Sequence, residues 1–295
     1  MAEQASPGLS VVVDQVFDHP EGLVWDARQS RLLWVDIFAG LVLSHDVASG
    51  PLQTWEIGRA VGAVAPRSKG GGLVCAVREG FGFLSAQGEF SLVTDQLRDR
   101  PYLQMNDGAV DALGRFWAGT TCLEPDAYQG AGTLYCLDAV TLEAAEHLGG
   151  IDVSNGIGWS PDGSRCYYID TPRKRVDVYP FDAESAEPLG ERKTLVEVDG
   201  VPDGLAVDSL GCIWVAMCGG WEVLRFTPSG RLDRVVRMPG SLVTTCCFGG
   251  PDLRTLFIAV SSRGLDDSSL RSEKAGYIFA LDPGVQGLPS PEFLG

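Results

Sequence analysis

An internal repeat constrains the fold of this chain more than any other feature. Four segments begin with a small-residue turn, run through an apolar pair, turn again at Asp-x-x-Gly or a similar motif, and continue into an aromatic-rich strand. They are "EGLVWDARQSRLLWVDI", "NDGAVDALGRFWAGT", "NGIGWSPDGSRCYYID" and "DGLAVDSLGCIWVAM". Two weaker copies are "VGAVAPRSKGGGLVCAV" and "TTCCFGGPDLRTLFIAV", so the same unit is present six times.

Short runs of alternating apolar and polar residues fill these copies and the sequence between them. Examples are "RLLWVDI", "GLVCAVR", "RCYYIDT" and "EVLRFTP", each bounded by Gly, Pro, Asp or Ser. Such runs predict strands of about five residues at the close spacing of an antiparallel fold. The copies recur roughly every 40–50 residues, a period typical of propellers with four-stranded blades. We therefore predict an all-β, six-bladed β-propeller of four-stranded antiparallel blades, forming one domain over residues 1–295. A sandwich or an irregular barrel would not require so regular a repeat.

The composition argues against several classes of partner. The net charge is −16 and the pI is about 4.5, whereas binding to nucleic acid or to an anionic membrane surface relies on Lys and Arg. No apolar segment has the length of a membrane-spanning helix, and the N-terminus has no signal-peptide pattern. Because a propeller closes on itself and needs no partner, we expect a monomer.

Cysteine and histidine usage narrows the chemistry further. The eight cysteines lie in hydrophobic runs without Cys-x-x-Cys spacing, which indicates buried, reduced thiols in a cytoplasmic protein. The three histidines, His19, His45 and His147, share no metal-ligand spacing. This argues against a histidine-bound zinc hydrolase and against a His-based catalytic triad.

Oxygen-bearing side chains recur at one phase of the repeat. In a propeller the innermost strand of each blade faces the central channel, and the loop leading into it projects onto one end. Equivalent positions of different copies therefore converge on the axis. In the four strong copies these positions hold two carboxylates and two amides, namely Glu21, Asn106, Asn155 and Asp203. Hard oxygen donors in this number suit a divalent cation with room for water and substrate. The weaker second copy has Val61 at this position, so the ring of ligands has an open side.

Turn formation is the alternative explanation for these residues. Asp-Gly and Asn-Gly are common turn dipeptides, because Asn and Asp tolerate the left-handed conformation and hydrogen-bond to their own backbone. Each site taken alone is therefore typical of a turn that leads into a strand. Turn chemistry does not require the same phase in four copies, however, and it does not explain Glu21, because Glu is a poor turn former.

Taken together and in this order, the motifs resemble the regucalcin (senescence marker protein)/gluconolactonase family. The resemblance runs from "EGLVWD" to "CFGGPDLRTLFIAV", with "NDGAVDALGRFWAGT", "SNGIGWSPDGSRCYYID" and "PDGLAVDSLGCIWVA" as its strongest parts. Within the family, "CFGGPDLRTLF" and "SRGLDD" are most similar to bacterial pentonolactonases. The resemblance implies a six-bladed propeller that hydrolyses sugar lactones at one divalent metal ion.

By motif, the resemblance implies that Glu21, Asn155 and Asp203 hold the metal. The ion would be Ca²⁺, Mn²⁺, Mg²⁺, Zn²⁺ or Fe²⁺, and it would polarise the lactone carbonyl as a Lewis acid. Asp203 is also the candidate catalytic base that accepts a proton from the attacking water.

The family's sugar-binding positions fall on Asn106, on Glu124 in "AGTTCLEPD", and on Gln104, which stands two residues before Asn106. Animal members often have Arg at the position of Gln104, and its loss argues against an anionic substrate. Trp221 in "CGGWEV" either stacks on a sugar face or packs at a blade edge.

Three functions are therefore compared. The first is hydrolysis of an aldonolactone such as gluconolactone, xylonolactone or arabinolactone. The second keeps the metal but acts on a phosphotriester or another ester. The third is a non-enzymatic, calcium-binding propeller, which predicts a full set of carboxylates, whereas the repeat offers two acids and two amides.

Overall fold

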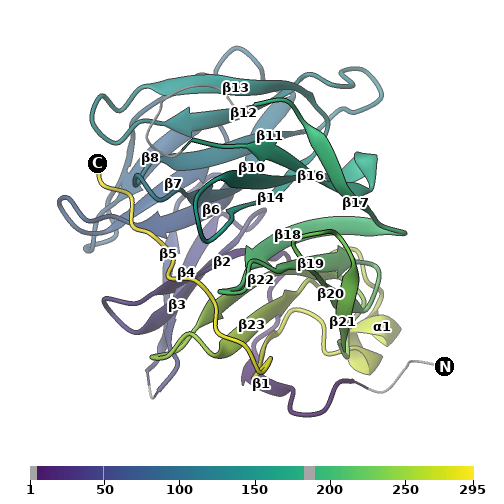
Figure 1. Cartoon of the computed structure of the whole chain (residues 1–295). Coiled ribbons are helices and arrows are strands. Elements are labelled where there is room, and N and C mark those ends of the chain that lie inside the picture. The colour runs from purple at the N-terminus through teal and green to yellow at the C-terminus, as the bar shows by residue number, and fades with distance from the viewer. Residues whose placement is uncertain (1–4, 49, 183–189) are drawn as a thin grey trace.

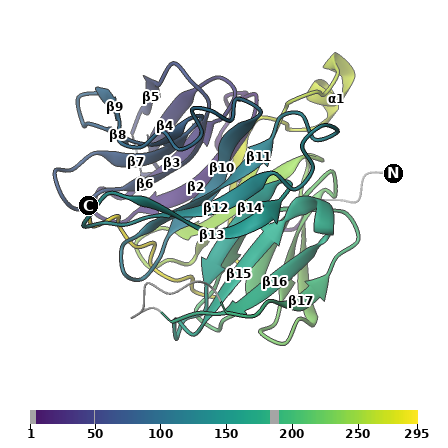
Figure 2. The same cartoon turned by 90° about the horizontal axis from the view of Figure 1, so that it is seen from above.

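The computed structural model describes residues 5–48, 50–182 and 190–295. Within these ranges the strands form six four-stranded antiparallel sheets arranged around an axis, as predicted (Figures 1 and 2). The inner strands are β2 (Pro20–Asp26), β6 (Val61–Pro66), β10 (Leu103–Val110), β14 (Ser154–Trp159), β18 (Val201–Val207) and β22 (Val243–Gly249). Each repeat copy of the sequence supplies one inner strand and the strand that follows it.

The remaining strands lie progressively farther from the axis. The second strands are β3 (Arg31–Asp36), β7 (Leu73–Val77), β11 (Phe116–Cys122), β15 (Arg165–Asp170), β19 (Ile213–Cys218) and β23 (Thr255–Val260). The third strands are β4 (Leu41–Asp46), β8 (Gly80–Leu84), β12 (Gly132–Leu137), β16 (Arg175–Pro180), β20 (Glu222–Phe226) and β24 (Ile278–Leu281). The outer strands are β5 (Leu52–Glu56), β9 (Phe90–Leu92), β13 (Ala144–Ile151), β17 (Lys193–Glu197), β21 (Leu232–Arg237) and β1 (Ser10–Val13).

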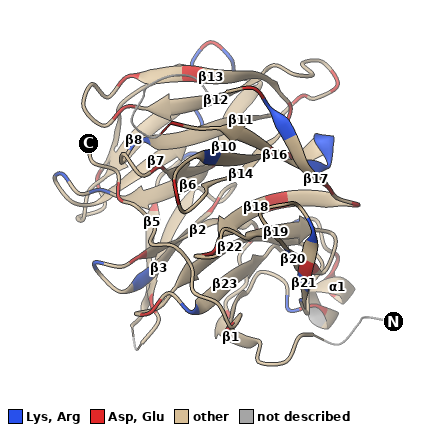
Figure 3. Cartoon of the chain, viewed as in Figure 1, with Lys and Arg blue, Asp and Glu red and all other residues tan. Residues whose placement is uncertain are grey.

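The first strand of the chain closes the ring. β1 pairs antiparallel with β24 and so supplies the outer strand of the last blade, with Ser10 opposite Ala280. Helical structure in the described ranges is limited to α1 (Asp267–Ser272) and a 3₁₀ turn at Thr171–Arg173. No helix there is long and apolar enough to cross a bilayer. In the view of Figure 3 the lysines and arginines are scattered over several blades.

The hydrophobic core is divided among the interfaces between blades. Six apolar clusters are present among the described residues, and each joins side chains of two neighbouring sheets. Trp34, Trp117 and Trp214 are fully buried within them. Packing between sheets, rather than a single central core, therefore stabilises the ring.

The aspartate that directly follows the inner strands β10 and β18 has a structural role. The Asp111 carboxylate accepts hydrogen bonds from Trp117 Nε1 at 2.8 Å and from Arg115 Nε at 2.7 Å. Asp208 likewise accepts hydrogen bonds from Trp214 Nε1 at 3.0 Å and from Arg225 Nε at 2.9 Å. These buried networks explain why Asp recurs in the sequence repeat at a distance from the candidate site.

The C-terminal segment crosses one end of the propeller. After β24 it hydrogen-bonds to the turn between β18 and β19, where Ser209 N donates to Gln286 O at 2.9 Å. It then reaches the end of β6, where Phe293 N donates to Pro66 O at 2.9 Å. The yellow segment in Figure 1 follows this path across the molecule. The opposite end, where the inner strands begin, is called the site end below.

Candidate functional site

The four residues selected by repeat phase all lie inside inner strands near the site end, and we call them the axial residues: Glu21, Asn106, Asn155 and Asp203. The expectation that they occupy turns leading into strands is therefore wrong. The Asn-Gly and Asp-Gly pairs instead lie where the pairing of the inner strands is interrupted. In β10, β14 and β18 the strand register shifts where the axial residue lies, between Met105 and Gly108 and at equivalent places in the other two strands.

Such a shift is a β-bulge, which adds a residue to one strand and re-aims its side chains. In β14 the bulge contains Asn155 and Gly156, and in β18 it contains Asp203 and Gly204. In β2 the shift follows Glu21, and Gly22 adopts a φ of +58°. The Asn-Gly and Asp-Gly pairs thus serve bulges within the ladder, which is why propensity alone indicated turns.

Glycine at the bulge also brings neighbouring inner strands together. A Cβ on Gly156 would lie 2.6 Å from Leu205 N and 2.9 Å from Asp203 O. No larger residue fits there without moving β18. The bulge therefore places Asn155 and Asp203 side by side near the axis, although they are far apart in sequence.

A chain of hydrogen bonds orients the two axial amides. Asn106 Nδ2 donates to Ser154 O at 2.8 Å and to Asn155 Oδ1 at 3.0 Å. Asn155 Nδ2 donates to Thr171 Oγ1 at 2.7 Å, and that hydroxyl donates to Pro202 O at 2.7 Å. The network fixes which atom of the Asn155 amide is the oxygen and links three consecutive blades.

The two axial carboxylates are buried close together. Glu21 is 4% exposed and Asp203 is 7% exposed, and their carboxyl groups are close enough to hydrogen-bond to each other. Burial, reinforced by the charges of Asp203 and Asp107, holds the pKa of Glu21 well above its ordinary value. Burial and then the charge of Asp107 also raise the pKa of Asp203. Among the described residues, no lysine or arginine pairs with either carboxylate.

This donor set fits a divalent cation. Ionised carboxylates that are buried without a counter-charge are unfavourable, and a bound cation would remove the penalty. Glu21 and Asp203 together with the Asn155 amide oxygen are hard donors of the kind that such ions prefer. In the described part of the chain, no group of three or more His, Cys, Asp or Glu side chains is arranged to hold a metal, so this set depends on the amide.

Asp107 is the site residue that sequence reasoning missed. It follows Asn106 in the β10 bulge, at the place where β14 and β18 have Gly156 and Gly204. Burial raises its pKa to about 6, against the opposing effect of the Gly108 N–H, which donates to Asp107 Oδ1 at 2.7 Å. The signal was the extra acid in "NDG", which the other copies lack.

The predicted sugar-binding residues lie in different settings. Gln104, on β10 opposite Thr121, is 2% exposed, and its Nε2 is buried without a hydrogen-bond partner. Glu124 is exposed in the connection between β11 and β12, and no hydrogen bond or ion pair joins its side chain to another described residue. Trp221 is half-buried in the turn between β19 and β20 at the site end, with a φ of +61°.

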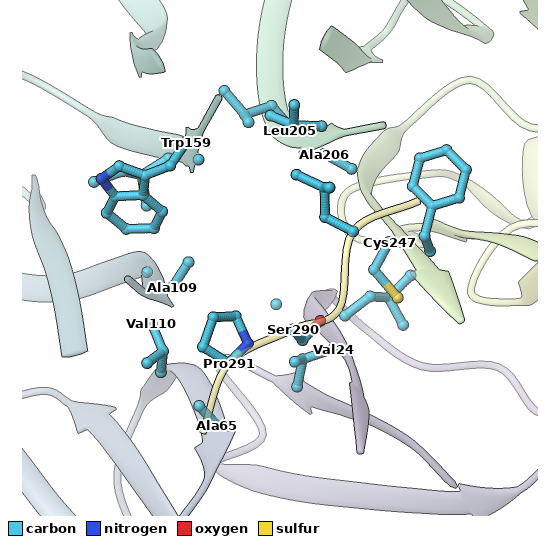
Figure 4. A pocket seen from close by; sticks show the side chains of 18 of the residues that line it. Val24, Ala65, Ala109, Val110, Trp159, Leu205, Ala206, Cys247, Ser290 and Pro291 are labelled. Atoms are coloured by element: carbon cyan, nitrogen blue, oxygen red, sulfur yellow. The ribbon is translucent and has the colours of Figure 1, made fainter. Parts of the chain in front are cut away.

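An apolar cavity of about 370 Å³ adjoins the candidate site and is also lined by the C-terminal segment. Asp107 and Gly22 lie among its lining residues, as do Ser290 and Pro291 of the C-terminal segment, which Figure 4 labels among the lining side chains. Most of its walls are apolar side chains, including Val24, Ala65, Ala109, Val110, Trp159, Leu205 and Ala206. Because it offers few polar groups, it does not have the chemistry of a sugar site.

Comparison with known proteins gives consistent matches. The sequence family described as "SMP-30/Gluconolactonase/LRE-like region" matches residues 19–262. The chain is 36% identical over 296 residues to a 6-deoxy-6-sulfogluconolactonase of Pseudomonas putida, covering 97% of this chain and 99% of the relative. It is 33% identical over 285 residues to regucalcin of Gallus gallus, covering 93% of this chain and 94% of the relative. A solved structure of a calcium-binding protein, regucalcin, from Agrobacterium tumefaciens superposes with a TM-score of 0.90 at 26% identity, covering 97% of each chain.

Proposed function

Because the chain belongs to the SMP-30/gluconolactonase/LRE-like family, we propose that it hydrolyses a sugar lactone at one divalent metal ion held by Glu21, Asn155 and Asp203. The observation that carries this proposal is the pair of buried carboxylates with no cationic partner among the described residues. The name of the P. putida relative supports a sugar lactone as the substrate class. The name of the A. tumefaciens structure supports a divalent cation.

When bound, the ion supplies Lewis acidity toward the lactone carbonyl and toward the oxyanion that water addition creates. Asn155 contributes an amide oxygen whose direction is fixed by hydrogen bonds at both ends of the amide group. Glu21 and Asp203 contribute the negative charge. All three ligands come from bulges or register shifts of rigid strands, so they are held in place before the substrate arrives.

We propose Asp203 as the group that takes the proton of the attacking water. Asp203 is buried at the axis beside Glu21, and a carboxylate in a fixed position can act as a general base toward a neighbouring water molecule. Glu21, which has the same charge, is positioned by the Gly22 N–H, which donates to its Oε2 at 3.0 Å. Both acids thus contribute negative charge to the proposed metal site, whereas the proton transfer is assigned to Asp203 alone.

Substrate orientation is assigned to the polar groups around the axial carboxylates. Gln104 has a buried Nε2 with no protein partner, and an unpaired buried donor suits a sugar hydroxyl or ring oxygen. The Asn106 Nδ2 is already engaged by Ser154 and Asn155, so its Oδ1 is the atom available to a sugar hydroxyl. Glu124 keeps its predicted role as a sugar contact from an exposed loop.

We also propose a cytoplasmic location, which rests on the cysteines. All eight are free, and seven of them are buried. Buried reduced thiols behave as small hydrophobes, and they are typical of proteins from reducing compartments.

Initial rates on a panel of pentono- and hexonolactones test the proposed function. Bound metal is first removed with a chelator, and the protein is then supplied in turn with Ca²⁺, Mn²⁺, Mg²⁺, Zn²⁺ and Fe²⁺. A phosphotriester and a simple aryl ester complete the substrate panel. We expect metal-dependent hydrolysis of at least one lactone. Acceleration of the phosphotriester alone would favour the alternative hydrolase, and no acceleration with any ion would refute the proposal.

The variant Asp203→Ala tests the site assignment separately. We expect it to lose both metal affinity and lactone turnover while the protein stays folded. If the Asp203→Ala protein kept both properties, the assignment of the site would be refuted, whereas the fold would not be in question.

A further inference from the structure

His19 stands at the start of the first inner strand, two residues before Glu21. Its carbonyl accepts a hydrogen bond from Ile37 N at 3.3 Å, which extends the pairing of β2 with β3 by one step. Gln104 has the same place in β10, two residues before Asn106. His19 therefore occupies in the first blade the position that Gln104 occupies in the third. Side chains two residues apart on a strand share a side.

The imidazole of His19 is held by a contact between the first and last blades. Its Nδ1 lies 2.8 Å from Ser261 Oγ, just after β23. That hydroxyl donates its own hydrogen to Asp18 O at 2.9 Å, so it accepts from the ring. The neutral imidazole therefore carries its hydrogen on Nδ1 and presents a lone pair on Nε2.

The surroundings of the ring keep it in this orientation. Phe38, in the turn between β3 and β4, has its ring centroid 5.4 Å from that of His19. The Arg263 guanidinium covers Phe38 at 3.7 Å and forms an ion pair with Asp18. All of these groups belong to connections at the site end, so the imidazole is a fixed part of its rim.

Nε2 of His19 is left without a partner among the described residues, and it is not sealed from solvent. The hydrogen bond from Nδ1 already joins the first and last blades, so Nε2 is not needed for that contact. An oriented acceptor at the rim of the site end matches a sugar hydroxyl, which donates. Gln104, at the same place in its own blade, offers the complementary donor through its free Nε2.

We propose that His19 is a specificity-determining residue of the axial site, and that its Nε2 accepts a hydrogen bond from one hydroxyl of the lactone. This inference rests on the proposed lactone hydrolysis. With the carbonyl at the axial carboxylates, the hydroxyl in question belongs to the part of the sugar nearer the rim. Hydrogen bonding to a substrate hydroxyl gives strong discrimination against an analogue that lacks it, because the protein group is then unpaired.

The test compares His19→Asn with His19→Gln on a lactone that the native protein hydrolyses. The Asn amide nitrogen can replace Nδ1 at Ser261 but leaves nothing at the position of Nε2, whereas the longer Gln side chain reaches that position with its amide group. We expect His19→Asn to lower kcat/KM about tenfold or more and His19→Gln to stay within about threefold of the native value. Equal losses in the two variants, or no loss in His19→Asn, would overturn the assignment.

Lactones that lack single hydroxyls separate recognition from a structural role. For the lactone lacking the contacted hydroxyl, we expect the loss in His19→Asn to shrink to about twofold or less. Metal affinity and Tm should stay at native values, as they should in the control His45→Asn on β4. The same loss on every lactone would show that His19 acts only through the structure. If the native protein hydrolyses no lactone, the proposed function fails first and this inference falls with it.

Discussion

The side-chain amide of Asn106 donates a 3.0 Å hydrogen bond to Oδ1 of Asn155, so one blade orients a proposed metal ligand of the next. The other end of the Asn155 amide is held in the same way, since its Nδ2 donates to Thr171 Oγ1 at 2.7 Å. Without such contacts, a side-chain amide can rotate and exchange the positions of its oxygen and nitrogen atoms at little cost. These two contacts fix Oδ1 of Asn155 on the side of Asn106 and Nδ2 on the side of Thr171.

Replacing Thr171 with Val should weaken metal binding although Thr171 touches no metal. The hydroxyl that holds the Asn155 amide would be lost. Loss of a group that orients a metal ligand typically lowers metal affinity about 10- to 100-fold, and we expect about tenfold here. Isothermal titration with Ca²⁺ measures the effect. Thr171→Ser keeps the hydroxyl and should bind as the native protein does. If Thr171→Val binds like Thr171→Ser, Asn155 does not depend on this contact.

Glu21→Gln should have opposite effects on metal binding and on the stability of the metal-free protein. The substitution removes one of the buried like charges of Glu21, Asp107 and Asp203, so metal affinity should fall. Unfolding of the metal-free protein in chelator at pH 8 should require on the order of 1 kcal/mol more free energy. Urea denaturation measures the second effect. The exposed Glu124→Gln serves as the control and should leave the free energy of unfolding unchanged. A metal-free Glu21→Gln protein that is less stable than the native one would show that the carboxylates do not repel each other.

The pH dependence of the metal-free protein should report Asp107. Its pKa is about 6 in the folded chain against an ordinary value of 3.8, so the folded state binds this proton more tightly. The resulting stability is fully present below about pH 4 and is lost as the pH rises through about 6. In Asp107→Asn the loss of stability with rising pH should be smaller, and what is left comes from Glu21 and Asp203, whose pKa values are also raised. Urea unfolding in chelator between pH 4 and 8 provides the comparison, and identical slopes in both proteins would contradict the assignment.

The sequence predicted the axial residues because the repeat carries phase information. Glu21, Asn155 and Asp203 occupy equivalent places in strong copies, and closing the ring brings equivalent places together. The same local sequences gave the wrong backbone, since Asn-Gly and Asp-Gly favour turns and bulges alike. Which of the two forms is decided by pairing with the next strand.

The contacts that sequence reasoning missed are those with no local pattern. His19 and Ser261 meet only because the first and last blades become neighbours when the ring closes. The C-terminal segment "LPSPEFLG" resembles no part of the repeat, so nothing indicated that Phe293 would be buried between blades. Both depend on the tertiary arrangement.

Anchoring of the C-terminal segment can be tested at two neighbouring positions. Phe293 is 0% exposed whereas Leu294 is 54% exposed. Phe293→Ala should destabilise the protein by about 3–5 kcal/mol, because it leaves a cavity among core side chains. Leu294→Ala should cost much less. Chemical denaturation of both variants gives the comparison, and equal small losses would mean that the segment contributes little to the fold.

Anomalous scattering from crystals grown with Mn²⁺ tests the central claim most directly. We expect one strong anomalous peak at bonding distance from the carboxylates of Glu21 and Asp203 and from Oδ1 of Asn155. The peak should disappear in Asp203→Ala. A peak held by other residues, or none at the axis in protein whose lactone hydrolysis requires Mn²⁺, would contradict the proposed metal site.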